Sequence, residues 1–225
     1  SMARRSSLLQ GHPITNIPNA INTNLFKPRA KKFAREKLHL PTDKKLLLFG
    51  SMKITDKRKG IDYLIEACKL LAQQEPELSK QLGVVVLGSQ AEQCKSLFPF
   101  PIYPMNYVSN EKELVDIYNA VDLYVTPSLQ DNLPNTIVEA MACGIPCVGF
   151  NVGGIPQMID HLHNGYVAQY KSADDLANGI CWTLTEGDYE TLSSEAYRKA
   201  VTTYSEATVA SQYIQIYNHI TGKNA

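Results

Sequence analysis

The alternation of short apolar runs with helix-patterned segments limits the fold more than any other feature of this sequence. Five apolar runs predict buried strands and a sixth run indicates another, at residues 45–50, 83–88, 102–108, 123–126, 146–150 and 165–167. Between them apolar side chains recur at helical spacing, as do Ile61, Leu64, Ile65, Cys68 and Leu71. Strands that alternate with helices of about 10–15 residues are typical of βαβ units. The pattern therefore predicts an α/β fold, a doubly wound, Rossmann-like parallel sheet with helices on both faces.

The remaining segments set the limits of the domain. Pro104 predicts that the third strand lies at an edge of the sheet, because proline cannot donate a hydrogen bond to an interior ladder. Beyond Lys171 only helical patterns occur, and the last one carries an apolar stripe formed by Val209, Tyr213, Ile216, Tyr217 and Ile220. Residues 1–16 predict a linker that begins with a cloning remnant, Ser1 and Met2. Residues 17–225 predict one domain of ordinary size.

Charge and apolar content exclude several classes of protein. Twenty-two Lys and Arg residues balance 22 Asp and Glu residues, so no global field attracts nucleic acid or an anionic membrane. No apolar run approaches the roughly 20 residues that span a bilayer, and no secretory signal opens the chain. The five cysteines form no Cys-x-x-Cys pair, which favours buried, inert thiols in a reducing compartment. We expect a cytoplasmic protein that, at full length, is free or peripheral at the inner face of a membrane.

One strand-to-helix junction, residues 126–144, carries the residues best suited to bind a ligand. In a parallel α/β sheet, ligands lie beyond the carboxyl ends of the strands and against helix N-termini. Pro134 stands where the first turn of a helix tolerates proline. The amides of Asn135 and Thr136 are then free to bind a phosphate without a positive side chain.

Two carboxylates flank these amides. Glu139 shares a helix face with Asn135 and Thr136, and it can accept two hydrogen bonds from a vicinal diol such as a ribose. Asp131, eight residues earlier, can reach a group attached beyond the phosphates. Ribose, diphosphate and sugar are thus contacted in the order that a nucleotide-sugar requires. The alternatives are that Asp131 or Asn132 only caps the helix, and that Glu139 is a solvated helix residue.

Several motifs together resemble one family. The run EAMACGIPCVGFNVGGIPQMI, preceded by PSLQDNLPNT, resembles the donor-site signature of the retaining glycosyltransferases of family four, which have the GT-B fold. Further matches are PNAIN with Phe26, FG followed by RKG, and YNAVD followed by PS. The resemblance extends from about Ile17 to Tyr217. Glu139 matches the second glutamate of the family's pair, and Asp131 occupies the place of the first.

The resemblance implies a role for each of these residues. Glu139 would hold the ribose hydroxyls and Asp131 the transferred sugar. Arg58 and Lys59 would neutralise the diphosphate, whose charge grows as the glycosidic bond breaks. Base recognition would fall on the segment from Met105 to Val108. The loop that would contact the donor, with its amides on the distal phosphate, consists of Asn132, Leu133, Pro134, Asn135 and Thr136.

Two departures from the family pattern bear on the phosphate site. Many relatives have an arginine where this chain has Ser51, so either Arg58 or Lys53 supplies that charge, and we expect Arg58. Pro134 replaces a glycine and removes one backbone amide. Apart from the resemblance, Arg58 and Lys59 are typical of a solvated basic turn.

The resemblance implies a retaining hexosyltransferase that uses a nucleotide-sugar and takes part in surface-polysaccharide assembly. This chain would be its donor-binding half, inactive alone. The acceptor, a glycan or a lipid-linked molecule, would bind an N-terminal domain preceding residue 1. The alternatives are a stand-alone nucleotide-binding module, and a hydrolase or nucleotide-sugar epimerase on the same fold.

The sequence predicts no cofactor, no metal and no nucleic-acid partner. The nicotinamide-binding Gly-x-Gly-x-x-Gly and the nucleoside-triphosphatase Gly-x-x-x-x-Gly-Lys do not occur. Nor does the Asp-x-Asp with which metal-dependent glycosyltransferases hold a divalent ion. His161 and His163 lack a third ligand nearby in the sequence.

Overall fold

A single parallel sheet organises the protein, whose computed structural model describes residues 6–9 and 11–222. The strand order is β3-β2-β1-β4-β5-β6, and each neighbouring pair is parallel. The strands are β1 Lys45–Lys53, β2 Leu82–Ser89, β3 Ile102–Met105, β4 Leu123–Thr126, β5 Cys147–Phe150 and β6 Gly165–Ala168. The predicted doubly wound, Rossmann-like sheet is confirmed.

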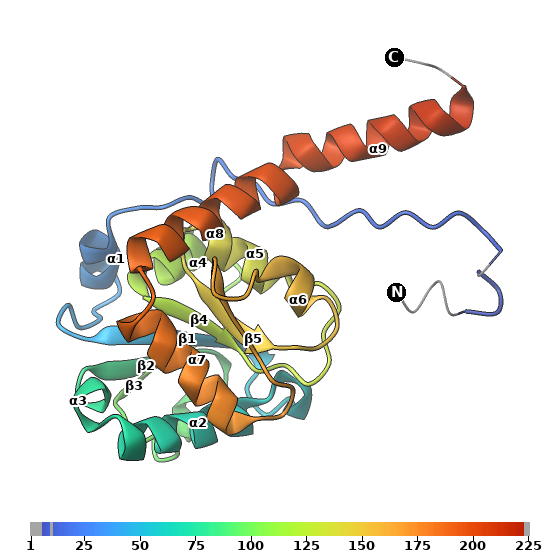
Figure 1. Cartoon of the computed structure of the whole chain (residues 1–225). Helices are drawn as coiled ribbons and strands as arrows, with labels where there is room; N and C mark the ends of the chain where they lie inside the picture. Colours follow the sequence, from blue (N-terminus) through green and yellow to red (C-terminus); the bar gives the residue numbers. More distant parts are fainter. Residues whose placement is uncertain (1–5, 10, 223–225) are drawn as a thin grey trace.

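Helices cover both faces of the sheet (Figure 1). One face carries α2 Ile61–Gln74, α3 Pro76–Ser79, η3 Ala91–Cys94 and α7 Ala173–Thr185. The other carries α1 Lys31–Lys37, α4 Glu111–Ala120, α5 Asn135–Ala142, α6 Ile155–Met158 and α8 Tyr189–Tyr204. Alternate strand residues enter the two cores, Leu46 and Leu48 one, Leu47 and Phe49 the other. Burial on both faces explains why the strands are apolar throughout.

The third strand is shorter than predicted. It ends at Met105, so the prediction of strand from 106 to 108 is wrong. β3 pairs only with β2, which confirms its place at the edge and explains how Pro104 is tolerated. Beyond Met105 the chain leads to α4. The N-cap of this helix is Asn110, whose side chain accepts a hydrogen bond from the amide of Lys112.

The chain ends in helices, as predicted, but the last stripe is not buried. In α9, Glu206–Thr221, only Val209 is buried, whereas Tyr213, Tyr217 and Ile220 are 46%, 60% and 73% exposed. The helix leaves the domain on the same side as the segment that precedes Ile21 (Figure 1). The Ile21 amide donates to the Tyr204 carbonyl oxygen at 2.8 Å and so fixes that segment at the end of α8. No helix within the described residues is long and apolar enough to cross a membrane.

The described residues before Ile21 have little secondary structure. The predicted remnant, Ser1 and Met2, lies outside the described residues. Residues 13–20 form no helix or strand. The linker over residues 1–16 stays a prediction.

The cysteines are largely core residues, as predicted. Cys68, Cys94, Cys143 and Cys147 are buried, and Cys181 is half-buried. Burial raises the pKa of the Cys143 thiol to about 12 and raises the pKa values of the other three buried thiols. These four thiols are therefore protonated and unreactive at neutral pH.

Candidate functional site

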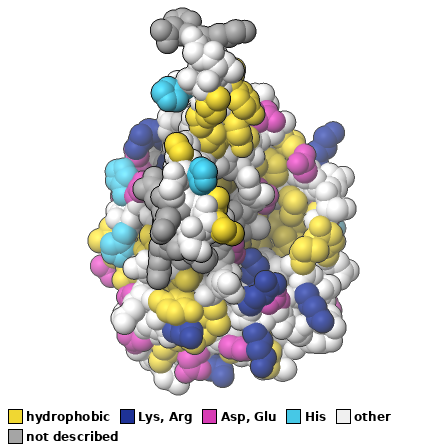
Figure 2. Space-filling model, turned by 90° about the vertical axis from the view of Figure 1, so that its right-hand side faces the viewer, with side chains coloured by type: hydrophobic (Ala, Val, Ile, Leu, Met, Phe, Trp, Pro, Cys, Tyr) yellow, Lys and Arg dark blue, Asp and Glu magenta, His cyan; other side chains and the backbone are white. Residues whose placement is uncertain are grey.

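The candidate site lies where the connections of the sheet change direction. β1 pairs with both β2 and β4, so the chain winds outwards in opposite senses on the two sides of β1. In such sheets a crevice forms beyond the carboxyl ends of the strands at this point. Figure 2 views the molecule from the side to which the strands point, and basic side chains gather in the lower half of this face.

A cavity of about 310 Å³ opens beyond β1 and β4. Leu48, Leu87 and Leu114 contribute to its apolar part, and its polar side chains come from separate loops and helices. Among these polar residues are Lys59 and Glu139, which stand 80 positions apart in the sequence. The fold therefore brings a predicted phosphate ligand and a predicted ribose ligand to one cavity.

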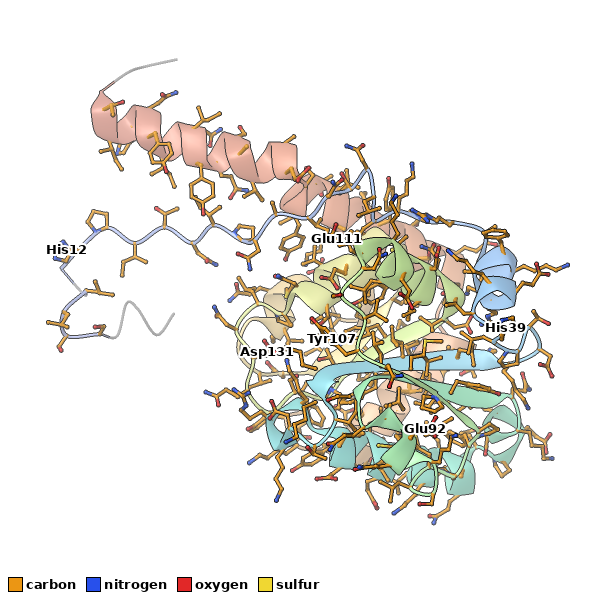
Figure 3. All side chains as sticks on the ribbon, turned by 180° about the vertical axis from the view of Figure 1, so that it is seen from behind. His12, His39, Glu92, Tyr107, Glu111 and Asp131 are labelled. Atoms are coloured by element: carbon orange, nitrogen blue, oxygen red, sulfur yellow. The ribbon has the colours of Figure 1, made fainter. Side chains whose placement is uncertain are left out.

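A second hollow, of about 340 Å³, adjoins the first through Lys59. Its lining consists of Arg58, Lys59, Gln130, Asp131, Asn132 and Gly153. The predicted sugar ligand Asp131 therefore lies beside both predicted phosphate ligands. Figure 3 labels Asp131 and Tyr107, which reach this end of the sheet from two different connections.

Asp131 is held by a cation and does not cap a helix. Its Oδ2 atom accepts a hydrogen bond from Lys59 Nζ at 2.7 Å, and its side chain is 15% exposed. The Ser128 hydroxyl lies 3.4 Å from the same oxygen, and the Asn132 amide donates to Oδ1 at 3.1 Å. The N-cap of α5 is Pro134, and no side chain caps the helix. The capping alternative for Asp131 and Asn132 is therefore wrong.

Without a capping side chain, the first turn of α5 offers its amides to a ligand. Pro134 lies at the N-cap, one position earlier than the first helical turn in which we expected it. Asn135 and Thr136 follow as the first two helical residues. Thr136 lines the 310 Å³ cavity together with Glu139, which agrees with their predicted common face.

Glu139 is half-buried, so its interpretation as a solvated helix residue is wrong. Its Oε2 atom accepts a hydrogen bond from the Tyr118 hydroxyl at 2.8 Å. Burial raises the pKa of the Glu139 carboxyl, the hydrogen bond from Tyr118 opposes that rise, and the charge of Glu111 adds to it. A carboxylate kept partly out of water in a cavity is typical of a functional group.

Arg58 and Lys59 form part of a 3-10 turn, η2 Lys57–Lys59, and differ in their partners. Arg58 is 70% exposed and donates to Asp56, from Nη2 to Oδ2 at 2.8 Å and from Nε to Oδ1 at 3.1 Å. The hydrogen bond from Arg58 lowers the pKa of Asp56. Lys53, the alternative to Arg58, ends β1 and lines neither hollow.

Two loops approach each other backbone to backbone at the end of η2. Gly60 has a φ of +71°, and a Cβ atom there would lie 1.9 Å from the carbonyl oxygen of Pro127. The Leu129 amide donates to the Arg58 carbonyl oxygen at 2.7 Å. Only glycine permits this approach, which fixes Lys59 next to the loop after β4.

The turn after β5 supports that loop from the other side. A Cβ atom on Gly153 would lie 1.7 Å from the carbonyl oxygen of Asp131, and one on Gly154 would lie 1.9 Å from that of Asn132. The Gly153–Gly154 pair therefore lies directly against the predicted sugar-binding loop.

The remaining predicted donor contacts are only partly brought together. Val108 lines the cavity. Met105 does not line it, but Met105 and Val108 together line a neighbouring hollow. Leu133 packs against the core, and the Asn135 side chain accepts a hydrogen bond from Asn19 Nδ2 at 3.0 Å.

Tyr107, inside the segment expected to recognise the base, lines the cavity. The sequence analysis missed Tyr118 and Tyr124, which also line it. Tyr118 and Tyr124 occupy otherwise apolar positions. A buried tyrosine hydroxyl needs a hydrogen-bond partner. In the sequence, this requirement was the only signal that Tyr118 and Tyr124 could belong to the site.

The two histidines of the 161–163 segment are engaged elsewhere. His163 Nε2 lies 3.0 Å from Glu195 Oε2, and His161 Nδ1 accepts a hydrogen bond from the Val167 amide at 3.1 Å. Within the part of the chain that the structure describes, no three His, Cys, Asp or Glu side chains are grouped to hold a metal ion. Metal independence stays a prediction.

The sequence matches the family model of the Glycosyl transferases group 1 over residues 43–186, which is more than half of the chain. The chain belongs to the glycosyl transferases group 1 family. This group 1 domain is 27% identical to a D-inositol 3-phosphate glycosyltransferase of Thermobispora bispora over 209 residues, 88% of this chain and 48% of that protein. It spans about half the length of the curated relatives that it matches first.

Solved structures agree with this assignment. The sucrose-phosphate synthase of Thermosynechococcus elongatus has a TM-score of 0.81 at 23% identity and covers 99% of this chain and 56% of its own. Alr3699/HepE of Anabaena, solved in complex with UDP-glucose, has a TM-score of 0.72 at 23% identity, with 90% and 57% covered. The group 1 domain thus has the fold of the C-terminal half of a GT-B glycosyltransferase, as the sequence resemblance predicted.

Proposed function

We propose that this domain binds the nucleotide-sugar donor of a retaining, metal-independent hexosyltransferase. The observation that carries the proposal is the position of Lys59, which lines the cavity of Glu139 and also pairs with Asp131 in the next hollow. A nucleoside diphosphate sugar has a diol, two phosphates and a hexose in this order. The complex of Alr3699/HepE with UDP-glucose supports the choice of such a ligand.

Each part of the donor has a suitable partner. The base would enter the apolar part of the cavity beside Tyr107 and Val108. The ribose hydroxyls would donate to Glu139. The diphosphate would lie against the first turn of α5, where Asn135 and Thr136 offer amides, and beside Lys59. The hexose would reach Asp131.

The basic turn would serve the reaction as the glycosidic bond breaks. Negative charge then accumulates on the leaving diphosphate, and a cation placed beforehand lowers the barrier. Lys59 is placed by its contact with Asp131, whereas Arg58 must leave Asp56 to reach the diphosphate. Both side chains would act through their positive charge alone.

The other half of the reaction would belong to a preceding domain. The relatives are about twice as long as this chain, which supports a second domain for the acceptor, a glycan or a lipid-linked molecule. The place of the full enzyme in surface-polysaccharide assembly, at the inner face of a membrane, is part of the same proposal.

Calorimetric titration of this domain with UDP, GDP and ADP tests the proposal. We expect saturable binding of at least one diphosphate, and loss of most of that affinity in Glu139→Ala. A folded domain that binds none of the three would contradict the proposal. A full-length enzyme that releases the diphosphate without an acceptor would instead indicate a hydrolase.

A further inference from the structure

We propose that Tyr118 is a positioning residue that fixes the carboxylate of Glu139 for the recognition of the two ribose hydroxyls. The inference rests on the proposed function, because it concerns how the same cavity recognises the nucleoside.

Tyr118 reaches Glu139 from a different element. It lies on α4, is 2% exposed, and donates its hydroxyl to Glu139 Oε2 at 2.8 Å. Burial raises the pKa of the Tyr118 hydroxyl well above its ordinary value, so the group is a permanent donor. A hydroxyl buried to this degree is costly unless it has such a partner.

The hydrogen bond leaves part of the carboxylate free. An ionised carboxylate has two oxygens with about four acceptor positions, and it donates nothing. Tyr118 occupies one position on Oε2 and fixes the side-chain rotamer. Glu139 also lines the cavity, so its remaining acceptor positions are open to hydroxyls of a bound ligand.

A second tyrosine braces the same helix. Tyr124, on β4, is also 2% exposed and donates to Thr136 Oγ1 at 2.8 Å. The rings of Tyr118 and Tyr124 pack edge to face, 6.1 Å apart at 73°. Both hydroxyls therefore donate to side chains of α5 that line the cavity, but only the hydroxyl of Tyr118 contacts Glu139.

This arrangement favours a ligand with two donors. A site built to hydrogen-bond a hydroxyl rejects an analogue without it, because a half-buried acceptor is then left unpaired. The rejection depends on the orientation of the acceptor, and the Tyr118 hydroxyl fixes that orientation. Removal of this hydroxyl lets the carboxylate rotate and find other partners, such as water.

The test compares the affinity for UDP with that for 2′,3′-dideoxyuridine diphosphate in calorimetric titrations. We expect the wild-type domain to prefer UDP, and Tyr118→Phe to reduce that preference roughly tenfold. Tyr204→Phe is the control, because it removes one hydroxyl from a buried ring that lines neither the cavity nor the hollow beside it. It should keep the wild-type preference.

A double-mutant cycle separates positioning from a general loss of stability. In a Glu139→Ala background, Tyr118→Phe should leave the UDP affinity nearly unchanged, because the carboxylate that it orients is already absent. An equal effect of Tyr118→Phe in both backgrounds would overturn the inference.

The possible failures can be told apart. A wild-type domain that binds neither UDP, GDP nor ADP contradicts the proposed function itself. A wild-type domain that prefers UDP, with a Tyr118→Phe variant of unchanged preference and unchanged thermal midpoint, contradicts only the role of Tyr118.

Discussion

At the scale of the residue, the site contains a carboxyl group whose burial opposes folding. The pKa of Glu139 lies above its ordinary value of 4.5, chiefly because burial disfavours the ionised form. Above the raised pKa the carboxyl is ionised in both the folded and the unfolded state, and burial of the charge then destabilises the folded state. The cost falls as the pH drops through the raised pKa, and it is absent below the unfolded value, where both states are protonated.

Glu139→Gln should therefore raise the free energy of unfolding at pH 7 and weaken UDP binding at the same pH. The glutamine carbonyl oxygen can still accept from Tyr118, but the ionic acceptor for the ribose is lost. Urea unfolding from pH 7 to pH 4 should show the stability difference shrinking as the pH falls. The exposed Glu77→Gln is the control, and no gain at pH 7 for Glu139→Gln would contradict the burial argument.

The basic turn makes a second prediction about single residues. Lys59→Ala should weaken UDP binding roughly tenfold or more, because a charge-assisted contact to the diphosphate is lost. Arg58→Ala should act in the same direction with a smaller effect, since its side chain is 70% exposed. Uridine, which has no phosphate, should bind all variants alike. Lys57→Ala is the control, because Lys57 lies in the same turn but lines a separate hollow. Equal losses for UDP and uridine would exclude a phosphate role for Lys59.

At the scale of the element, the approach of two loops fixes the site. Gly60→Ala should lower the free energy of unfolding by about 2 kcal/mol or more, since alanine is strained at positive φ and its Cβ meets backbone. Gly144→Ala is the matched control at a φ of +73°, because its Cβ would meet the ends of the Ser193 and Pro28 side chains at 3.0 and 3.3 Å. Chemical unfolding should show the larger loss for Gly60→Ala, with a fall in UDP affinity that Gly144→Ala lacks. Equal losses of unfolding free energy in the two variants would mean that the clash with the backbone of Pro127 costs nothing beyond the strain of alanine at positive φ.

The strands and helices were predictable because their patterns are local. An apolar run such as 83–88 determines a buried strand with little help from distant residues, and Pro104 marks the sheet edge by the hydrogen bond that it cannot make. That Asp131 and Glu139 lie at the same end of the sheet was predictable because they belong to one short junction. The contacts of Tyr118 and Lys59 depend on which loops meet in space, and neither composition nor spacing contains that information. The exposure of Tyr217 was unpredictable for the same reason, since an apolar stripe does not specify its partner.

At the scale of the whole molecule, the residues predicted to bind the donor gather at one end of the domain. Lys59, Asp131 and Glu139 line hollows beyond the carboxyl ends of β1 and β4. Above them, hydrophobic side chains gather near the top of the same face (Figure 2). Tyr213 and Tyr217 of α9 are exposed within the described part of the chain.

This geometry predicts that the isolated domain binds donor but does not transfer its sugar. Transfer requires an acceptor held against the hexose and a cleft closed against water, and both would come from the preceding domain. Titration with UDP-glucose should show binding if the donor is a uridine sugar, whereas release of UDP should stay at the uncatalysed rate. The protein extended to the length of its relatives, assayed with the same donor and acceptor, is the control and should release UDP at least a hundredfold faster. Transfer by the isolated domain at a comparable rate would mean that its own residues complete the active site. The donor hollows and the acceptor site would then have to lie together on this one domain.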